Sequence, residues 1–272
     1  MLKVENISIR GFEEALRGMR NPKDSWDRSD SEYLSINEYV KKYGKDDLEI
    51  IISKENPEQP DIPVFTLKPD FDTIDRNQLI INTLPHYSDV EKLGNEVPMV
   101  ITMDTIPILG ENDLQLANSL CRGGPVHGKF SRFIQVYIDI TASFDFWKEM
   151  DTYRAGKESN SCSTMHRITK NPISIDNYST ADLRPQDIEF MKNNIKYYQS
   201  VLDDDTLTDL RKTQILSKIN MTGFEQKRTL MLSYETLHNI CTWRKGHKLE
   251  EWRYLVNSVI MKFPYFEYFF FK

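Results

Sequence analysis

The sequence has few cysteines and no long apolar run. Its three cysteines, Cys121, Cys162 and Cys241, are odd in number and widely spaced, which argues against a disulfide framework and for a reducing compartment. No stretch approaches the roughly 18 to 20 consecutive apolar residues that a membrane-spanning helix needs. The first residues mix charges throughout, unlike the apolar part of a signal peptide. We therefore expect a cytoplasmic protein with no membrane partner.

Basic residues are also in short supply. Lys plus Arg number 35 against 41 Asp plus Glu, which gives a net charge of −6. A chain this acidic is a poor candidate for binding a nucleic-acid backbone, because neutralising the phosphates requires a basic face. A small phosphorylated ligand needs only two or three local cations and is compatible with this charge.

The common cofactor and catalytic motifs are missing. There is no Gly-x-Gly-x-x-Gly and no Gly-x-Ser-x-Gly, so neither a Rossmann dinucleotide site nor a hydrolase nucleophile elbow is indicated. The segment from Gly123 to Lys129 begins like a phosphate-binding P-loop, but Phe130 stands where Ser or Thr would hold magnesium. The five His and three Cys do not form pairs with zinc-ligand spacing, so no metal site is expected.

What is present is enough apolar material for a sizeable core, with 14 Phe, 13 Tyr, 4 Trp and 10 Met. In the first half, local patterns predict helices over 12–19 and from the Ser35–Glu38 capping box to Lys42, and strands over 48–53 and 64–67. The stretch from about 44 to 107 is punctuated by Pro and acidic residues. We interpret it as a peripheral insertion and not as a separate domain.

The patterns become clearer after Gly110. Asn112 is expected to cap a helix that ends at Gly123, and the β-branched and aromatic run over 133–141 is the best strand of the chain. A short aromatic helix follows over 144–150. Residues 151–166 are too polar for a comfortable helix or strand and are expected to be a loop. Amphipathic helices are predicted over 185–198, 206–219, 226–243 and 249–263.

Two polar clusters remain open from the residues alone. Within 151–166, four hydroxyls lie between positions 159 and 164, and with Arg154, Lys157 and His166 they could collect a phosphate, or form a solvated loop. Within 242–252, Arg244 and His247 end one helix and two glutamates begin the next. The helix dipole accounts for that second arrangement without any function.

Five blocks of the sequence, taken together, resemble the flavin-dependent thymidylate synthase family, most closely its divergent branch in phages and Gram-positive bacteria. The blocks are ALRGMRNPKDSWDRSDS, LGENDLQLANSLCRGGPVHGKFSRFIQVYIDITA, FWKEMDTYRAGKESNSCSTMH, QKRTLMLSYETLHNI and WRKGHKLEEW. They cover 12–30 and 109–252 and leave 45–105 uncovered.

The resemblance implies an α+β fold, a small twisted sheet flanked by helices with a helical C-terminal half. It implies one domain over 1–272 with a peripheral insertion at 45–105, and a homotetramer with the flavin between subunits. Members of the family bind FAD and dUMP, take hydride from NADPH, and transfer a one-carbon unit from methylenetetrahydrofolate to carbon 5 of the pyrimidine. The reduced flavin makes a cysteine nucleophile unnecessary, which fits a chain without a convincing catalytic cysteine.

The family motif is Arg-His-Arg, followed by Ser, Asn, Ser and Arg at fixed intervals. When its Asn is laid on Asn160 and its later Ser on Ser163, the triplet falls on residues 153–155, Tyr-Arg-Ala. The last Arg then falls on Met165 and the following Tyr on His166. The Asn-x-x-Ser core is kept, whereas two triplet residues and the last Arg are replaced. Arg154 and His166 could supply part of the missing charge.

The resemblance also assigns roles residue by residue. The residues expected at the nucleotide are Arg154, Asn160, Ser161, Ser163, Thr164, His166, Arg228 and Arg244, with Arg154 and Arg228 on its phosphate. Arg244 would contact the pyrimidine and polarise it as carbon 5 becomes nucleophilic, and with Ser163 it forms the expected catalytic pair. The residues expected to line the flavin are His127, Asn239 and His247. His127 has an alternative interpretation as a surface histidine beside a Gly-Gly-Pro turn.

The replaced arginines leave three functions open. The first is thymidylate synthase-like transfer to dUMP. The second is a different modification of a deoxyuridylate, such as hydroxymethylation for phage DNA. The third is a catalytically degenerate homologue that binds the nucleotide without modifying it.

Overall fold

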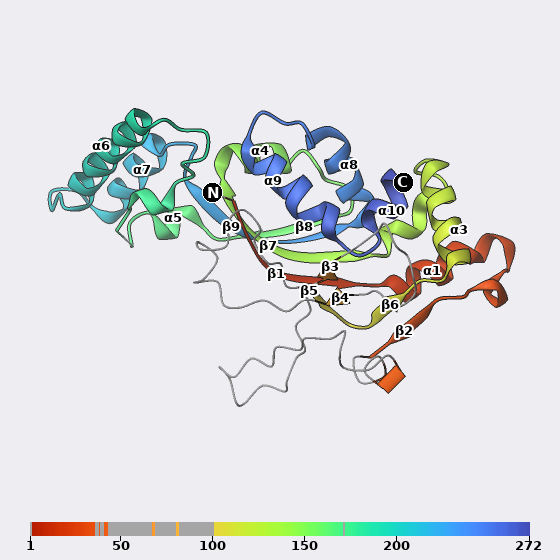
Figure 1. Ribbon diagram of the computed structural model, residues 1–272. Coiled ribbons are helices and arrows are strands. Elements are labelled where there is room, and N and C mark those ends of the chain that lie inside the picture. The colour runs from red at the N-terminus through yellow and green to blue at the C-terminus, as the bar shows by residue number, and fades with distance from the viewer. Residues whose placement is uncertain are drawn as a thin grey trace.

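The computed structural model describes residues 2–35, 38, 41–42, 67–68, 80–81, 101–170 and 172–272 (Figure 1). Its centre is a five-stranded sheet in the spatial order β5, β1, β7, β9, β8. In that order the strands span Ile101–Met103, Lys3–Arg10, Gln135–Ser143, Glu225–Ser233 and Lys157–Ser161. β5 runs parallel to β1, and the other neighbours in the sheet are antiparallel. The expected mixture of helix and sheet is therefore present, with a small and mostly antiparallel sheet.

Helices cover one face of this sheet. The described α-helices are α1 Phe12–Arg20, α3 Glu111–Arg122, α4 Phe144–Met150, α5 Thr164–Arg167, α6 Pro185–Leu202, α7 Asp209–Ile219, α8 Tyr234–Arg244, α9 Glu250–Tyr254 and α10 Phe266–Phe271. Short 3₁₀ turns are η1 Asn21–Lys23, η2 Trp26–Arg28, η4 Gly128–Arg132, η5 Ile175–Asn177 and η7 Ile260–Lys262, and η6 Leu255–Val259 is π-helical. Figure 1 shows α4, α8, α9 and α10 gathered over the sheet, and α5, α6 and α7 grouped beyond one end of it. Two further strand pairs are β2 Glu32–Leu34 with β6 Ile106–Ile108, and β3 Leu67–Lys68 with β4 Ile80–Ile81.

The longest pairing in the sheet joins β7 and β9. Nine residues of each strand are in register, from Gln135 opposite Ser233 to Ser143 opposite Glu225. Successive side chains of a strand alternate between the two faces, and the even-numbered residues from Val136 to Ala142 on β7 are buried beneath the helices. This strand confirms the one predicted over 133–141, shifted by two residues.

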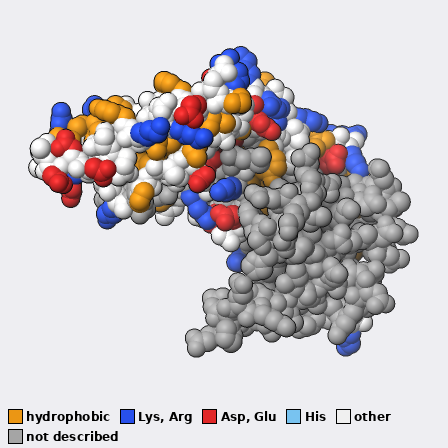
Figure 2. All heavy atoms as spheres, turned by 60° about the vertical axis from the view of Figure 1, so that its left-hand side comes forward, with side chains coloured by type: hydrophobic (Ala, Val, Ile, Leu, Met, Phe, Trp, Pro, Cys, Tyr) orange, Lys and Arg blue, Asp and Glu red, His pale blue; other side chains and the backbone are white. Residues whose placement is uncertain are grey.

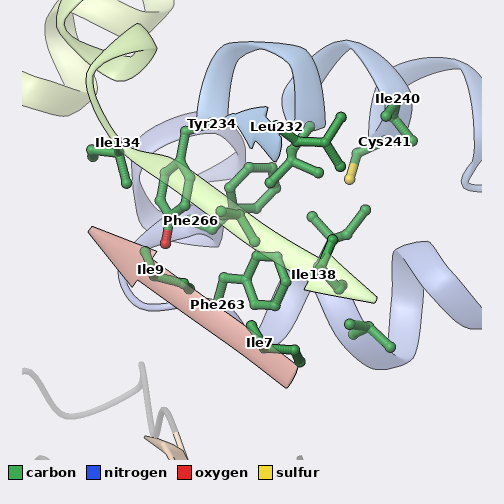
Figure 3. Close-up of a cluster of buried hydrophobic side chains, with 14 of the residues drawn as sticks. Ile7, Ile9, Ile134, Ile138, Leu232, Tyr234, Ile240, Cys241, Phe263 and Phe266 are labelled. Carbon is green, nitrogen blue, oxygen red and sulfur yellow. The ribbon is translucent and has the colours of Figure 1, made fainter. Parts of the chain in front are cut away.

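The core forms where this face meets the C-terminal helices (Figure 3). Ile7 and Ile9 of β1 and Ile138 of β7 point toward Phe263 and Phe266, and all five are buried. The aromatic tail from 263 to 272, which we did not predict to be structured, thus closes the core. A second small cluster holds the α5–α7 group together; it comprises Ile168, Ile173, Tyr178, Met191, Tyr198, Val201, Leu216 and Phe224.

Most of the locally predicted helices are confirmed. α1, α4, α6 and α7 match the predictions over 12–19, 144–150, 185–198 and 206–219, and the segment 249–263 is helical through α9, η6 and η7. The expected cap at Asn112 is wrong, because α3 already begins at Glu111. Asp30 caps this helix from a distant loop by accepting the backbone N–H groups of Asn112 and Asp113.

Two predictions are wrong because strand pairing is not local. The segment 151–166, expected to be a loop, contains the edge strand β8 and helix α5. Polar side chains are compatible with β8 because most of them are exposed. The helix predicted over 226–243 is the strand β9 followed by α8. In β9 the side chains of Leu230 and Leu232 alternate into the core with a period of two.

Several expectations fall largely outside the described residues. Ser35 and Glu38 do form the reciprocal hydrogen bonds of a capping box. The strand expected over 48–53 lies outside the described residues, as does most of that over 64–67. Most of the insertion expected at 45–105 does too, although its end supplies β5 of the central sheet. Among the described residues no helix is long and apolar enough to cross a membrane.

A buried ion pair joins the end of α1 to the start of α3. Arg20 Nε donates to Asp113 Oδ1 at 2.6 Å, and both side chains are buried. Ser29 and Ser31 donate their hydroxyls to Asp113 Oδ2 at 2.7 and 2.6 Å. Hydrogen bonds to both oxygens offset the cost of removing the charge from water.

Replacing Asp113 by Ala should lower the free energy of unfolding by about 3–5 kcal/mol, because Arg20 is left buried without a counter-charge. Urea denaturation followed by circular dichroism measures the loss. Glu189→Ala, which removes the exposed partner of Lys192, is the matched control and should leave the midpoint unchanged. A loss no larger than the control's would contradict a structural role for this pair.

On the open face of the sheet a carboxylate joins three strands. Asp139 accepts hydrogen bonds from Asn6 at 2.8 Å and Thr229 at 2.6 Å, and Lys227 lies 3.3 Å away. Asn6 has a positive φ of 51° at the point where the register of β1 shifts. Burial alone would raise the pKa of Asp139, but these hydrogen bonds outweigh it and hold the pKa below its usual range.

Asp139→Asn should therefore destabilise the protein at pH 7 by about 1–3 kcal/mol. A lowered pKa stabilises the fold above the ordinary pKa of a carboxyl group and ceases to do so as the pH falls through the folded value. The difference from the unmodified protein should shrink toward zero below about pH 4. Chemical denaturation from pH 3 to 8 tests this, with the exposed Asp205→Asn as control. A difference that stays constant with pH would contradict it.

Candidate functional site

The candidate site lies where two helices end. α4 follows β7 and α8 follows β9, and in each case the strand's last residue, Ser143 or Ser233, caps the helix with its hydroxyl. Because the strands are antiparallel, the two helices start at opposite ends of the ladder, and contacts between Glu149 and Arg244 join their C-terminal ends. Helix C-termini carry partial negative charge, so cations are stabilised there.

Glu149 in the last turn of α4 binds two predicted site residues at once. Its Oε2 lies 2.6 Å from Arg244 Nη1 and 3.0 Å from His247 Nε2. Arg244 also donates from Nε to the Tyr153 hydroxyl at 3.0 Å, and its guanidinium lies 5.2 Å from the ring centre of Trp252. We call Glu149, Arg244, His247 and Tyr153 the Glu149 cluster.

Both ring nitrogens of His247 are engaged. Nδ1 accepts the backbone N–H of Leu249 at 3.2 Å, so the ring proton is on Nε2, which faces Glu149. Through these two contacts His247 helps to hold the geometry of the cluster.

Two residues further on, Asp151 binds a second pair of cations. Arg228 Nη1 donates to both Asp151 oxygens at 2.9 and 3.1 Å. Lys157, which is 8% exposed, donates to Asp151 Oδ1 at 3.2 Å and to the carbonyl of Met150 at 3.0 Å. Burial alone would raise the pKa of Asp151, but the two cations hold it below its usual range.

Gln226 links this pair to the segment with the expected nucleotide-binding hydroxyls. Its Oε1 accepts from Arg228 Nε at 2.9 Å, while its Nε2 donates to the Cys162 carbonyl at 2.7 Å and to Thr164 Oγ1 at 3.3 Å. We call Asp151, Arg228, Lys157 and Gln226 the Asp151 cluster.

Aromatic rings connect the two clusters. The Arg228 guanidinium lies 4.4 Å above the Trp147 ring. Trp147 meets Phe146 edge to face at 5.1 Å, and Phe146 stacks on Trp252 at 4.2 Å. Trp252 is the ring beneath Arg244, so both arginines lie on one buried aromatic row, in geometry that favours cation–π attraction.

Strand alternation separates residues that are neighbours in the sequence. Ser161 is opposite Arg228 in the β8–β9 pairing, on the face that the helices cover. Asn160 is opposite Thr229 and therefore lies on the other face. Within one chain, Asn160 and Ser161 cannot contact the same small ligand through their side chains.

The remaining predicted residues lie outside the two clusters. Arg154 is exposed in the loop before β8, His127 is exposed at the start of η4, and Asn239 is exposed on α8. Ser163 and Thr164 come directly after β8, with Thr164 beginning α5. His166 falls within α5, but its side chain is not among those that the structure describes.

Residue-by-residue reasoning missed the carboxylates that hold the arginines. In the sequence, Glu149, Asp151 and Gln226 belong to no motif, and Lys157 is only a charge near the hydroxyl-rich segment. The one available signal was an acidic pair at the end of the predicted helix 144–150, where the dipole disfavours anions. Because the helix dipole disfavours these carboxylates, their position predicts that cations from other parts of the fold lie next to them.

Two of the three cysteines have largely buried thiols. Burial raises the pKa of both the Cys121 and the Cys241 thiol to about 12, which makes these cysteines inert at neutral pH. No group of His, Cys, Asp and Glu with metal-binding geometry occurs in the described part. In the view of Figure 2, basic and acidic side chains are interspersed over the described surface, with no continuous basic stripe. Charged and planar groups for a small anionic ligand are therefore concentrated at the two clusters.

No protein-family model and no curated protein sequence matches the chain. Among solved structures, the chain is similar to thymidylate synthase X (ThyX) from Helicobacter pylori with FAD and dUMP, at 14% sequence identity and a TM-score of 0.49. A second structure, of flavin dependent thymidylate synthase ThyX from the same organism complexed with FAD and dUMP, gives the same values. Each match covers 60% of this chain and 83% of the other. An identity and a TM-score this low carry no weight for function.

A double-mutant cycle tests the Glu149 cluster. Glu149→Gln and Arg244→Met should each destabilise the protein, and their effects should be non-additive by about 0.5–3 kcal/mol, because they share one contact. Thermal or urea denaturation of the four proteins gives the coupling energy. Asp145 and Lys148, an exposed pair on the same helix, should couple by less than about 0.5 kcal/mol. Additive effects at Glu149 and Arg244 would show that the contact does not form.

Proposed function

We propose that the chain is a flavin-dependent enzyme of the thymidylate synthase type that binds dUMP or a close deoxyuridylate. Two kinds of observation support this. The five sequence blocks resemble that family, and Arg228 and Arg244, which the resemblance assigns to the nucleotide, lie on one aromatic row at the end of α4. This convergence of two segments 16 positions apart in the sequence, on different elements, is the observation that carries the proposal.

In this proposal the nucleotide binds at the two clusters. Arg228 and Arg154 bind its phosphate, Arg244 contacts the pyrimidine, and hydroxyls of Ser161, Ser163 and Thr164 donate to it. Asn160 and His166 complete the expected set. Since Asn160 is on the other face of the sheet, its contact would be to a ligand shared with a second subunit, consistent with the expected homotetramer.

Around Asn239, one of the three residues expected at the flavin, the surface carries planar groups. Asn239 and Trp243 are four positions apart on α8 and share its exposed side, with Trp243 75% exposed. Beside them His238 stacks on Phe270 at 4.4 Å. In this proposal the Asn239 amide and the exposed Trp243 ring hold an isoalloxazine, together with His127 at the start of η4 and the cluster residue His247. FAD would supply the hydride chemistry, with NADPH and methylenetetrahydrofolate as co-substrates.

One replaced position of the family motif contacts a residue assigned to the nucleotide. Tyr153 occupies the position of the first triplet arginine, and its hydroxyl accepts a hydrogen bond from Arg244. A second arginine at this point would face Arg244 with like charge. The tyrosine avoids this repulsion, and the loss of the motif's arginines leaves hydroxymethylation or binding without turnover as alternative outcomes at the same site.

The visible absorption spectrum of the purified protein, with FAD added and dUMP then titrated, tests the proposal. We expect flavin bands that shift on adding dUMP. Combining Ser163→Ala with Arg244→Ala should abolish the dUMP response and retain the fold by circular dichroism. Arg211→Ala with Ser217→Ala, exposed positions on α7, makes the same changes away from the site and should respond normally.

A protein that stays colourless with FAD would contradict the flavoenzyme proposal, and dUMP affinity unchanged in the site variant would contradict the assignment of the site. If both FAD and dUMP bind, the mass of the product after turnover distinguishes methylation from hydroxymethylation. Absence of any product would favour a homologue that binds the nucleotide without modifying it.

A further inference from the structure

The end of α4 carries more positive than negative charge. Its cations are Arg228, Lys157 and Arg244, and its anions are Asp151 and Glu149. In this formal count, as in that of the whole chain, histidine is taken as neutral at pH 7. This formal excess of one positive charge stands out in a chain of net charge −6. The carbonyl of Met150 and the helix ends offset part of it, but largely buried cations are best stabilised by a full counter-charge.

Of these cations, Arg228 and Lys157, which share Asp151, have the less complete set of hydrogen-bond acceptors. Arg228 Nη1 serves both oxygens of Asp151, while its Nη2 has no hydrogen-bond partner among the described residues. Lys157 shares Asp151 Oδ1 with Arg228. A guanidinium can bind an oxyanion through two nitrogens, and a phosphate offers three oxygens where a carboxylate offers two.

Of the three residues in this ion-pair group, Asp151 can most easily move away from the other two. Its side chain is 49% exposed, against 15% for Arg228 and 8% for Lys157. It is the C-cap residue of α4, where the helix dipole disfavours an anion. The two cations are fixed by other contacts: Arg228 by Gln226 and the Trp147 ring, and Lys157 by the Met150 carbonyl.

We propose that Arg228 and Lys157 form a phosphate-binding pair, and that the Asp151 carboxylate competes with the substrate's phosphate for it. The inference rests on the proposed function for the identity of the ligand, a nucleoside monophosphate. A phosphate monoester carries about two negative charges. When it replaces Asp151, the phosphate and Glu149 together balance the three positive charges of the group. Asp151 thereby weakens the binding of any singly charged anion and favours a dianionic phosphate monoester.

Calorimetric titration of the full chain with dUMP, deoxyuridine and inorganic phosphate tests the competition. Asp151→Asn should bind dUMP and inorganic phosphate about fivefold more tightly than the unmodified protein, because the internal carboxylate is removed. Deoxyuridine, which has no phosphate, should bind both proteins equally. Asp187→Asn, which breaks an Arg–Asp pair on α6 with the same change of charge, should have no effect.

Two further variants complete the test. Asp151→Ser repeats the gain in affinity with a different side chain if the Asn variant folds poorly. Lys157→Met should weaken dUMP about tenfold and leave deoxyuridine unchanged, and Lys157→Arg should restore most of the loss. Melting temperatures show that each variant is folded.

The outcomes separate the two proposals. If dUMP binds the unmodified protein and Asp151→Asn with equal affinity, the competition is wrong and the proposed function stands. If dUMP binds neither but inorganic phosphate binds Asp151→Asn more tightly, the competition stands and the nucleotide is wrong. If none of these phosphates binds either protein, the phosphate-binding pair itself is refuted.

Discussion

The antiparallel pairing of β7 with β9 is the constraint from which the rest of the structure follows. Nine residues of each strand are in register, and a serine at the end of each strand caps the following helix. Because the strands are antiparallel, α4 and α8 approach each other from opposite ends of the ladder. Their C-termini meet, and the partial negative charge of two helix ends accumulates at one place. Cations from three different elements are concentrated there.

These cations are held in place by the protein's own carboxylates. Glu149 and Asp151, two positions apart, each bind one arginine, and aromatic rings run between the arginines. In the proposed site such internal partners would orient the guanidinium groups before the ligand arrives, which would lower the entropy cost of binding. They would also oppose binding wherever the ligand needs the same nitrogens. Glu149 is the more enclosed partner, with 33% of its side chain exposed against 49% for Asp151, so in this proposal Glu149 orients and Asp151 exchanges.

The sequence points to the arginines of the proposed site but not to the carboxylates that hold them. Arg228 and Arg244 came from the resemblance, since spacing alone leaves them as ordinary helix or strand charges. Glu149 and Asp151 carry no motif, and their importance arises from residues 77 and 95 positions further along the chain. Asn160 and Ser161 show the opposite case, in which neighbours in the sequence are separated in space. They are adjacent in a motif, but the pleat of β8 places them on opposite faces.

The sequence by itself determined the elements whose signals are local. The helices 12–20, 144–150 and 185–202 show their periodicity and capping within a few residues, and β7 shows its β-branched run. Only the tertiary structure decided that the polar segment from 157 is an edge strand and that 225–233 is a strand and not a helix. Both depend on hydrogen bonds to partners far away in sequence, which no local window contains. The same physical reason applies to the site, because its charges acquire a role only when the helix ends are brought together.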